Sequence, residues 1–153
     1  MKNQIILLLI AFISISGFAQ TETKRVAQFN LEKNVAVQGY DVVSYFKQKK
    51  AVKGKKTLAL NYEGVVYYFS TEANKEAFKK NPVSYEPQYG GWCAFAMGDS
   101  NSKVEIDPET FKIVDDKLYL FYNAFFNNTL KSWNKDEVNL KRKADTNWKN
   151  YIK

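Results

Sequence analysis

The chain has 153 residues, 45% of them apolar and 16% aromatic, and this composition is typical of one folded domain with a hydrophobic core. Histidine is absent and there is one cysteine, which excludes imidazole-based catalysis, histidine-containing zinc sites and an intrachain disulfide. The formal net charge of +7 would permit binding to anionic surfaces. However, the lysines are interspersed with acidic residues, so we expect solvated faces and no nucleic-acid site.

Residues 1–19 are predicted to be a secretory signal peptide. Lys2 supplies a positive start, residues 5–15 form an apolar run, and residues 17–19 end in the small residue that a signal peptidase reads. The apolar run is shorter than the ~20 residues needed to span a bilayer. We therefore expect cleavage after Ala19, no membrane span in the mature protein, and a periplasmic or secreted location.

The next segment, residues 20–34, is polar and is predicted to be a flexible leader, followed by a single domain over residues 35–153. Residues 35–37 suggest a short strand that ends at Gly39. A two-turn helix should follow over residues 41–46, because apolar side chains stand at helical spacing and Asp41 occupies the place of an N-cap.

Two β-hairpins are predicted further along the chain. Residues 57–62 and 65–69 are rich in β-branched and aromatic side chains and flank the turn Glu63-Gly64. The second hairpin comprises residues 111–114 and 118–122, with a loop over 115–117. Before it, Asp107-Pro108-Glu109 is expected to form a turn.

Helices should connect and follow these hairpins. Ser70 or Thr71 caps a helix that Pro82 terminates, with a buried stripe formed by Ala73, Ala77 and Phe78. Residues 124–133 look helical but are interrupted at Asn127-Asn128. A last amphipathic helix should begin near Asn134 or Asp136 and bury one side, namely Val138, Leu140, Ala144, Trp148 and Tyr151.

These elements predict an α+β fold, with two short antiparallel β-hairpins packed against several short helices and a C-terminal amphipathic helix.

Cys93 and Met97 are the candidate metal ligands. They are the one cysteine and the one methionine besides Met1, and a four-residue spacing places both sulfurs on one face of a helix. Thiolate and thioether ligands favour Cu(I), although a third ligand is not evident in the sequence. The alternative is that both are core residues, because free Cys and Met are commonly buried and their neighbours are apolar.

Two further groups of polar residues are considered. Seven tyrosines line either a ligand pocket or the rim of the core: Tyr40, Tyr45, Tyr62, Tyr67, Tyr68, Tyr85 and Tyr89. Four acids are candidates for acid–base pairs or a calcium site, but they match no calcium loop and are better explained as turn and cap residues: Asp41, Glu105, Asp107 and Glu109.

The pattern Tyr62-x-Gly64-x-x-Tyr67-x-Phe69-Ser70, followed by Phe78-x-x-x-Pro82-x-x-Tyr85, resembles the YHS domain. That small module occurs in metal-handling proteins, including some heavy-metal transporting ATPases and multicomponent monooxygenases. Residues 39–46 and 87–94, with Asp107-Pro108, are similar to secreted, stand-alone YHS-domain proteins of bacteria. The likeness extends over roughly residues 35–148.

The resemblance implies a metal cluster that this chain departs from. In metal-binding relatives, cysteines stand before a glycine near the start and in a Phe-Cys-Ser-x-x-Cys run after the second strand. Those positions correspond here to Gln38, Ser70 and Asn74, and Tyr68 or a neighbour replaces the family's histidine. Cys93 lies outside that cluster but matches a position typical of the secreted group.

We therefore expect a secreted, non-catalytic YHS-like binding module that binds or handles a soft metal, Cu(I) or Zn, through Cys93 with Met97, or that engages a periplasmic protein partner. One alternative is a protein-interaction or structural domain in which Cys93 is inert core. Another is a thiol-dependent enzyme, which the absence of histidine disfavours.

Overall fold

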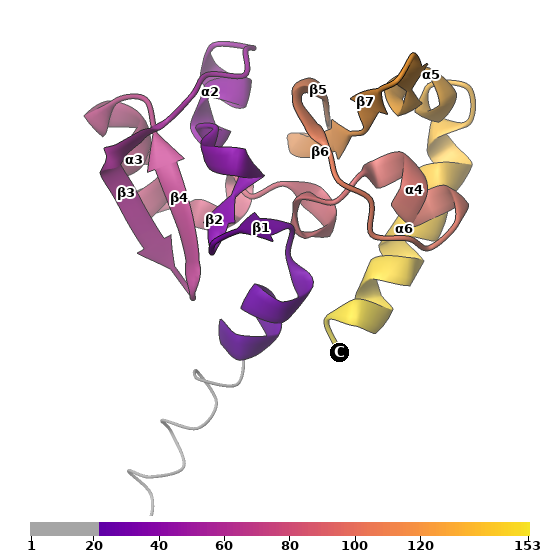
Figure 1. Cartoon of the computed structure of the whole chain (residues 1–153), viewed down its shortest axis with the longest axis horizontal. Coiled ribbons are helices and arrows are strands. Elements are labelled where there is room, and N and C mark those ends of the chain that lie inside the picture. The colour runs from indigo at the N-terminus through magenta and orange to yellow at the C-terminus, as the bar shows by residue number, and fades with distance from the viewer. Residues whose placement is uncertain (1–21) are drawn as a thin grey trace, which may run out of the picture.

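The computed structural model describes residues 22–153 (Figure 1). The predicted signal peptide lies outside the described residues. Within residues 22–153, no helix combines the length and the apolar character needed to cross a membrane. The described chain combines helices with antiparallel hairpins and ends in a long helix, so the predicted α+β class is confirmed.

The first predicted hairpin is the centre of a four-stranded sheet with the order β1-β2-β4-β3. Strands β3 (Lys55–Tyr62) and β4 (Val65–Phe69) pair antiparallel across the turn at Glu63 and Gly64, which both have positive φ angles, 48° and 82°. Strand β2 (Val35–Ala36) lies parallel to β4, and β1 (Leu31–Glu32) pairs antiparallel with β2. The strand predicted over residues 35–37 is shorter than expected, because Val37–Gly39 forms a 3-10 turn, η1.

Two helices pack beside this sheet. Helix α2 (Val42–Lys47) begins as predicted at Asp41, whose carboxylate accepts a hydrogen bond of 2.9 Å from the Val43 amide. Helix α3 (Glu72–Lys80) is capped by Thr71 and is followed by the 3-10 turn η2 (Pro82–Ser84). Its buried stripe differs from the prediction. Asn74 is buried with Phe78, whereas Ala73 is exposed. Asn74 can be buried because its side chain donates a hydrogen bond to the Asp41 carboxylate.

The described part of the predicted flexible leader packs against the rest of the chain. Residues 22–28 are helical, and residues 31–32 form β1. The Phe29 ring lies 6.0 Å from the ring of Trp148, near the C-terminus. Residues 22–34 thus form regular structure, and their apolar and charged side chains contact residues far away in the sequence; the flexibility expected of this segment stays a prediction.

The second predicted hairpin is present as β5 (Asp107–Val114) and β6 (Lys117–Phe121), joined at Asp115 and Asp116 with positive φ angles of 50° and 55°. The predicted turn at residues 107–109 is the irregular start of β5. There the Asp107 carboxylate accepts hydrogen bonds from the Glu109 amide at 3.0 Å and the Thr110 hydroxyl at 2.8 Å. The strand pairing shifts register between Asp107 and Phe111 for this reason.

The helix predicted over residues 124–133 is wrong in its first half. Residues 123–128 form a small hairpin of β7 (Asn123–Ala124) and β8 (Asn127–Asn128). Helix α5 (Thr129–Trp133) starts only afterwards, because the Asn128 side chain accepts a hydrogen bond of 3.1 Å from the Leu130 amide.

The C-terminal helix α6 (Glu137–Tyr151) follows the prediction in extent, with Asp136 as its N-cap residue. It buries Leu140 and Ala144 as expected, but Val138 is 81% exposed and does not belong to the packed side. Helix α6 crosses the shorter α4 (Ala94–Asp99) closely, since a Cβ atom at Gly98 would clash with the backbone carbonyl of Leu140.

Strand β6 separates two buried clusters. Leu118 and Leu120 belong to the cluster formed with α2 and β4, whereas Tyr119 and Phe121 belong to the cluster formed with Trp133 and α6. Alternate residues of a strand point to opposite faces, so one strand, buried from Leu118 to Phe121, contributes side chains to both clusters. This arrangement joins the sheet half and the helical half of the molecule seen in Figure 1.

Candidate functional site

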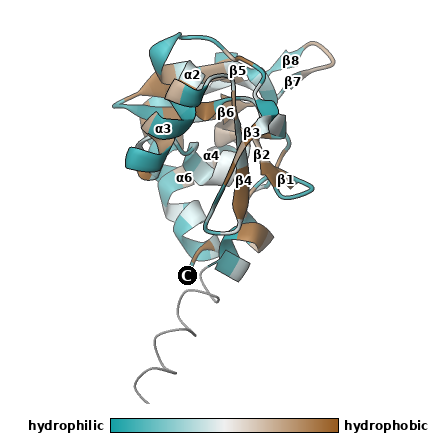
Figure 2. Cartoon of the chain, turned by 90° about the vertical axis from the view of Figure 1, so that its left-hand side faces the viewer, coloured by the Kyte–Doolittle hydropathy of each residue, from teal (hydrophilic) through white to brown (hydrophobic). Residues whose placement is uncertain are grey.

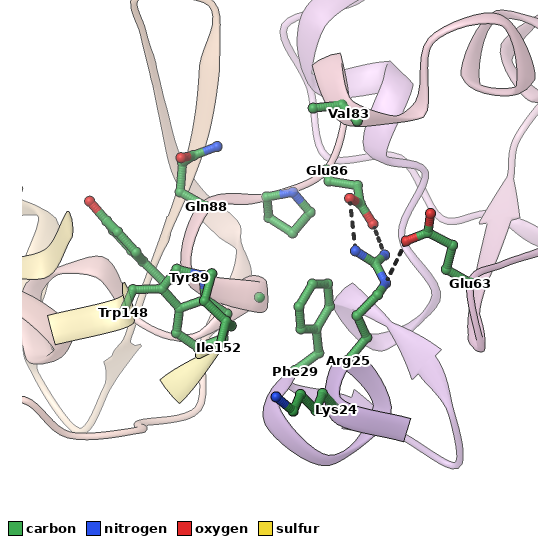
Figure 3. A pocket seen from close by; sticks show the side chains of 12 residues that line it. Lys24, Arg25, Phe29, Glu63, Val83, Glu86, Gln88, Tyr89, Trp148 and Ile152 are labelled. Carbon is green, nitrogen blue, oxygen red and sulfur yellow. Dashed lines mark hydrogen bonds and ion pairs between the residues drawn. The ribbon is translucent and has the colours of Figure 1, made fainter. Parts of the chain in front are cut away.

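An open cleft of about 560 Å³ lies where the two ends of the described chain meet. One wall comes from residues 24–29, the base from η3 (Gln88–Gly91), and the opposite wall from the end of α6 (Figure 3). Its lining combines charged, aromatic and aliphatic side chains: Lys24, Arg25, Phe29, Glu63, Val83, Glu86, Pro87, Gln88, Tyr89, Gly90, Trp148 and Ile152.

A charged cluster centred on Arg25 forms one side of the cleft. The Arg25 guanidinium donates two hydrogen bonds to the Glu86 carboxylate, through Nη2 to Oε1 and, at 3.4 Å, through Nη1 to Oε2. Arg25 Nε lies 3.3 Å from Glu63 Oε2, although without hydrogen-bond geometry. The Tyr67 hydroxyl donates to Glu86 Oε1 at 2.5 Å. The cluster thus joins the N-terminal helical segment (residues 22–28), the β3–β4 turn and the segment after η2.

The electrostatics of this cluster favour a permanently charged arginine. Partial burial lowers the pKa of Arg25, but the hydrogen bonds and the negative field of Glu86, with that of Glu63, raise it more. Burial likewise raises the pKa of Tyr67, and the adjacent Glu86 carboxylate raises it further. The guanidinium also lies 4.6 Å from the centre of the Phe29 ring, so its position is held by aromatic as well as acidic partners.

The other side of the cleft is aromatic, and it depends on a glycine. Gly90 has a φ angle of +60°, and a Cβ atom there would lie 2.8 Å from both Phe29 and Trp148. Only a residue without a side chain allows the two rings to approach the base of the cleft in this way. The Gly90 carbonyl also accepts a hydrogen bond of 2.9 Å from the Asn30 amide, which fixes the N-terminal wall to the base.

A separate buried polar network surrounds Asp41. Its Oδ2 atom accepts hydrogen bonds from the Ser70 amide at 2.8 Å, the Ser70 hydroxyl at 2.6 Å and the Asn74 side chain at 2.8 Å. Asp41 is fully buried, and its other oxygen caps α2. The network ties α2 to the end of β4 and to the first turn of α3, so Asp41 has more than the cap role expected from sequence.

Cys93 and Met97, the candidate metal ligands, are both core residues. Cys93 precedes α4 and Met97 lies within it; both are fully buried, but Cys93 belongs to the cluster that includes the β4 side chains and Met97 to the cluster that includes Trp133. Cys93 Sγ already has two neighbours: the Thr129 hydroxyl at 3.4 Å, and the Tyr122 amide, which donates to the sulfur at 3.4 Å. This geometry favours the core alternative, and the metal role of the two residues stays a prediction.

The remaining sequence candidates are dispersed. Tyr45 and Tyr67 lie in the core, and the Tyr45 hydroxyl donates to the Pro108 carbonyl at 2.8 Å. Of the seven tyrosines, Tyr89 is the one that lines this cleft. Arg25, Phe29 and Trp148 were not singled out by sequence reasoning as site residues. The one local signal in the sequence is the pair Gly90-Gly91, because adjacent glycines allow a tight backbone path without indicating what that path accommodates.

Comparison with known proteins gives one match. Residues 43–89 match the YHS domain model. Neither the search of curated proteins nor the search of solved structures found a match. The matched segment runs from α2 to η3, and it therefore contains the hairpin, the Asp41 partners Ser70 and Asn74, and the Glu86 side of the cleft.

The YHS match locates the cleft at a boundary. Glu63, Glu86 and Tyr89 come from the matched segment, whereas Arg25, Phe29 and Trp148 come from the flanking parts of the chain. The cleft is therefore formed jointly by residues of the matched segment and by residues before and after it.

The residues at the positions of the YHS cysteines do not fit a soft-metal cluster. Ser70 and Asn74 do converge, but as donors to the Asp41 carboxylate. The Gln38 side chain instead donates to the Ile106 carbonyl at 3.0 Å. Hydroxyl and amide groups are poor ligands for soft metals. Across residues 22–153, no three or more His, Cys, Asp or Glu side chains are grouped so that they could hold a metal ion.

Proposed function

We propose that this protein is a YHS-like, non-catalytic binding module whose ligand site is the cleft between residues 24–29 and the end of α6. The observation that carries the proposal is the preformed cleft itself, in which the Arg25–Glu86 pair stands beside the Phe29 and Trp148 rings. Concave sites with a mostly apolar wall and a few fixed polar groups are typical of ligand binding.

The lining favours a small amphipathic ligand with a flat apolar part. Phe29 and Trp148 provide the surface for the flat part, and Gln88 with the Arg25–Glu86 pair provides polar partners for its other end. The charged groups of the cleft are already engaged with protein atoms, including Lys24, which donates to the Lys153 carbonyl at 2.8 Å. A paired arginine can orient a ligand, and it keeps its proton in proteins, which supports binding over acid–base catalysis by Arg25.

The test is a titration of isotope-labelled protein, starting at residue 20, with a library of aromatic fragments followed by nuclear magnetic resonance. We expect the Gly90 amide and the Trp148 indole signals to shift first. Ile152→Arg places a charge at the rim of the cleft and should weaken binding about tenfold. Val138→Arg is the matched control, because Val138 is an exposed apolar residue of α6, the helix that Ile152 follows, and lies outside the cleft. Fragments that leave these signals unmoved, or that bind Ile152→Arg as well as wild type, would overturn the proposal.

Soft-metal binding through Cys93 with Met97 is the competing proposal, and it is supported by the four-residue spacing of the two sulfur residues and by the YHS match, which ends before Cys93. Its test is native mass spectrometry of wild type and Cys93→Ala after anaerobic loading with Cu(I) or Zn(II). An ion retained by wild type and lost in the variant would establish Cys93 as a ligand. Equal spectra would leave the cleft as the binding site.

We also propose that the mature protein is periplasmic or secreted. This proposal is supported by the charge, apolar run and cleavage pattern of residues 1–19. Expression of the full chain in a bacterium, followed by fractionation and N-terminal sequencing, should recover a protein that begins at Gln20 outside the cytoplasm. Recovery of the uncleaved chain in the cytoplasm would contradict it.

A further inference from the structure

The tip of the β7–β8 hairpin carries two aromatic side chains in full contact with solvent. Phe125 is 91% exposed and Phe126 is 112% exposed. Figure 2 shows the hairpin projecting from the body of the molecule, with the hydrophobic colour at its tip. Among residues 22–153, the two strands pair only with each other, so the tip is a narrow, convex apolar point.

The backbone at the tip is also unusual for these residues. Phe125 and Phe126 have positive φ angles of 50° and 64°, the combination of a type I′ hairpin turn. That turn strongly favours Asn-Gly, and bulky side chains are rare at such angles. Neither ring stacks on another aromatic ring within residues 22–153. The exposed rings and the positive φ angles of these bulky residues both cost stability, and no internal contact among the described residues compensates for that cost. We therefore look for the role of these two residues outside the folded chain.

Two lysines follow the tip closely in the sequence. Residues 121–135 contain Lys131 and Lys135 and no acidic residue, and the next acid, Asp136, comes directly after them. Lys131 and Lys135 are exposed on and just after α5, which directly follows the hairpin. The acid that contacts the hairpin is Asp107, whose carboxylate is engaged at the base by Thr110 at 2.8 Å and Asn123 at 3.4 Å.

We propose that this hairpin tip inserts Phe125 and Phe126 into the interface of an anionic lipid bilayer, with Lys131 and Lys135 near the lipid headgroups. A bilayer deforms around a convex apolar point, whereas a protein partner would need a matching pocket to enclose two side chains that offer no hydrogen bond. Apolar insertion combined with basic residues is the pair of signals that peripheral membrane binding requires. The inference is independent of the ligand cleft.

The test is co-sedimentation of the protein, starting at residue 20, with lipid vesicles. One vesicle contains equal parts of phosphatidylcholine and phosphatidylglycerol, and the other contains phosphatidylcholine alone. Phe125→Asn with Phe126→Gly is the informative variant, because Asn-Gly suits the turn and should preserve the hairpin. We expect wild type to bind the anionic vesicles more tightly and this double variant to bind about tenfold more weakly.

Two further variants separate the contributions. Lys131→Glu with Lys135→Glu should weaken binding to the anionic vesicles and leave the weak binding to neutral ones unchanged. Val138→Asn removes an exposed apolar side chain elsewhere and should have no effect. Equal vesicle binding by the Asn-Gly variant, or no binding by wild type, would overturn the proposal. So would a dimer in sedimentation velocity that the Asn-Gly variant abolishes, because a second copy would then cover the tip.

Discussion

At the scale of single residues, Asp41 is the point at which three segments of the chain are joined. Its carboxylate accepts hydrogen bonds from Val43, Ser70 and Asn74. Two of the three positions that the YHS resemblance assigns to cysteines, Ser70 and Asn74, are donors to this carboxylate. The polar network thus holds together the same three elements, α2, β4 and α3, by hydrogen bonds.

Asp41→Ala should therefore lower the free energy of unfolding by about 3 kcal/mol, because it leaves several buried donors without an acceptor and removes the cap of α2. Equilibrium unfolding in urea measures the change. Asp99→Ala is the control, since Asp99 is exposed at the end of α4 and its loss should change stability by less than about 0.5 kcal/mol. Similar values for the two variants would show that the network contributes little.

Cys93 provides the second prediction at this scale. Its sulfur is fully buried between Thr129 and Tyr122, so a thiol reagent should not modify it in the folded protein. Labelling should begin only when urea unfolds the chain, at a rate that follows the unfolded fraction. Rapid stoichiometric labelling in buffer would contradict this packing and would return Cys93 to the list of candidate ligands.

At the scale of elements, the start of α6 depends on Glu137. Its carboxylate accepts hydrogen bonds of 2.8 Å from Lys112 and 3.0 Å from the Trp133 indole. Partial burial raises the pKa of Glu137, but these hydrogen bonds and the charge of Lys112 together lower it more, to below its ordinary value of 4.5. A lowered pKa means that the ionised form stabilises the fold. This contribution is present above the ordinary pKa and is lost as the pH falls through the lowered one.

Glu137→Gln should consequently lower the free energy of unfolding by about 1 kcal/mol at neutral pH and by less in acid. Urea unfolding of both proteins between neutral pH and the acid limit measures the difference. Glu105→Gln alters an exposed acid and serves as the control. A difference that stays constant with pH would show that the carboxylate charge is not responsible.

At the scale of the whole molecule, both clusters that flank β6 contain buried tyrosines. Burial raises the pKa of Tyr119 to about 12. It raises the pKa of Tyr45, Tyr67 and Tyr89 as well, each with a contribution from nearby carboxylates. The folded protein therefore keeps these hydroxyls protonated when the unfolded chain would release the protons. Stability is fully present below the ordinary pKa of 10 and falls as the pH rises above it.

We expect alkaline unfolding in which tyrosinate absorbance and loss of helical circular dichroism occur together. Tyr119→Phe is the specific test, because the buried Tyr119 hydroxyl has no hydrogen-bond partner within the described residues. This variant should be as stable as wild type or more stable at neutral pH and should lose less stability in alkali. Tyrosinate that forms gradually, well before unfolding, would indicate exposed hydroxyls instead.

Local sequence determined most of the elements of this protein. Asp41, Glu63-Gly64 and Pro82 mark where α2 begins, where β3 turns into β4 and where α3 has ended. Such signals are readable because a cap, a tight turn or a missing amide acts within a few residues. Where two local interpretations competed, as in residues 123–128, the strand pairing of the asparagines prevailed over the helical pattern.

The candidate site was decided by tertiary structure. Arg25 meets Glu86 and Phe29 meets Trp148 across long stretches of chain, and Asn74 is buried only because Asp41 lies opposite. The spacing of residues in the sequence cannot predict these long-range contacts, because they depend on how the sheet, α6 and the N-terminal helical segment pack. The sequence by itself specified an α+β domain with a YHS-like hairpin and one cysteine. Packing decided that the cysteine is enclosed, and that the accessible cleft lies where the two ends of the described chain close on Gly90.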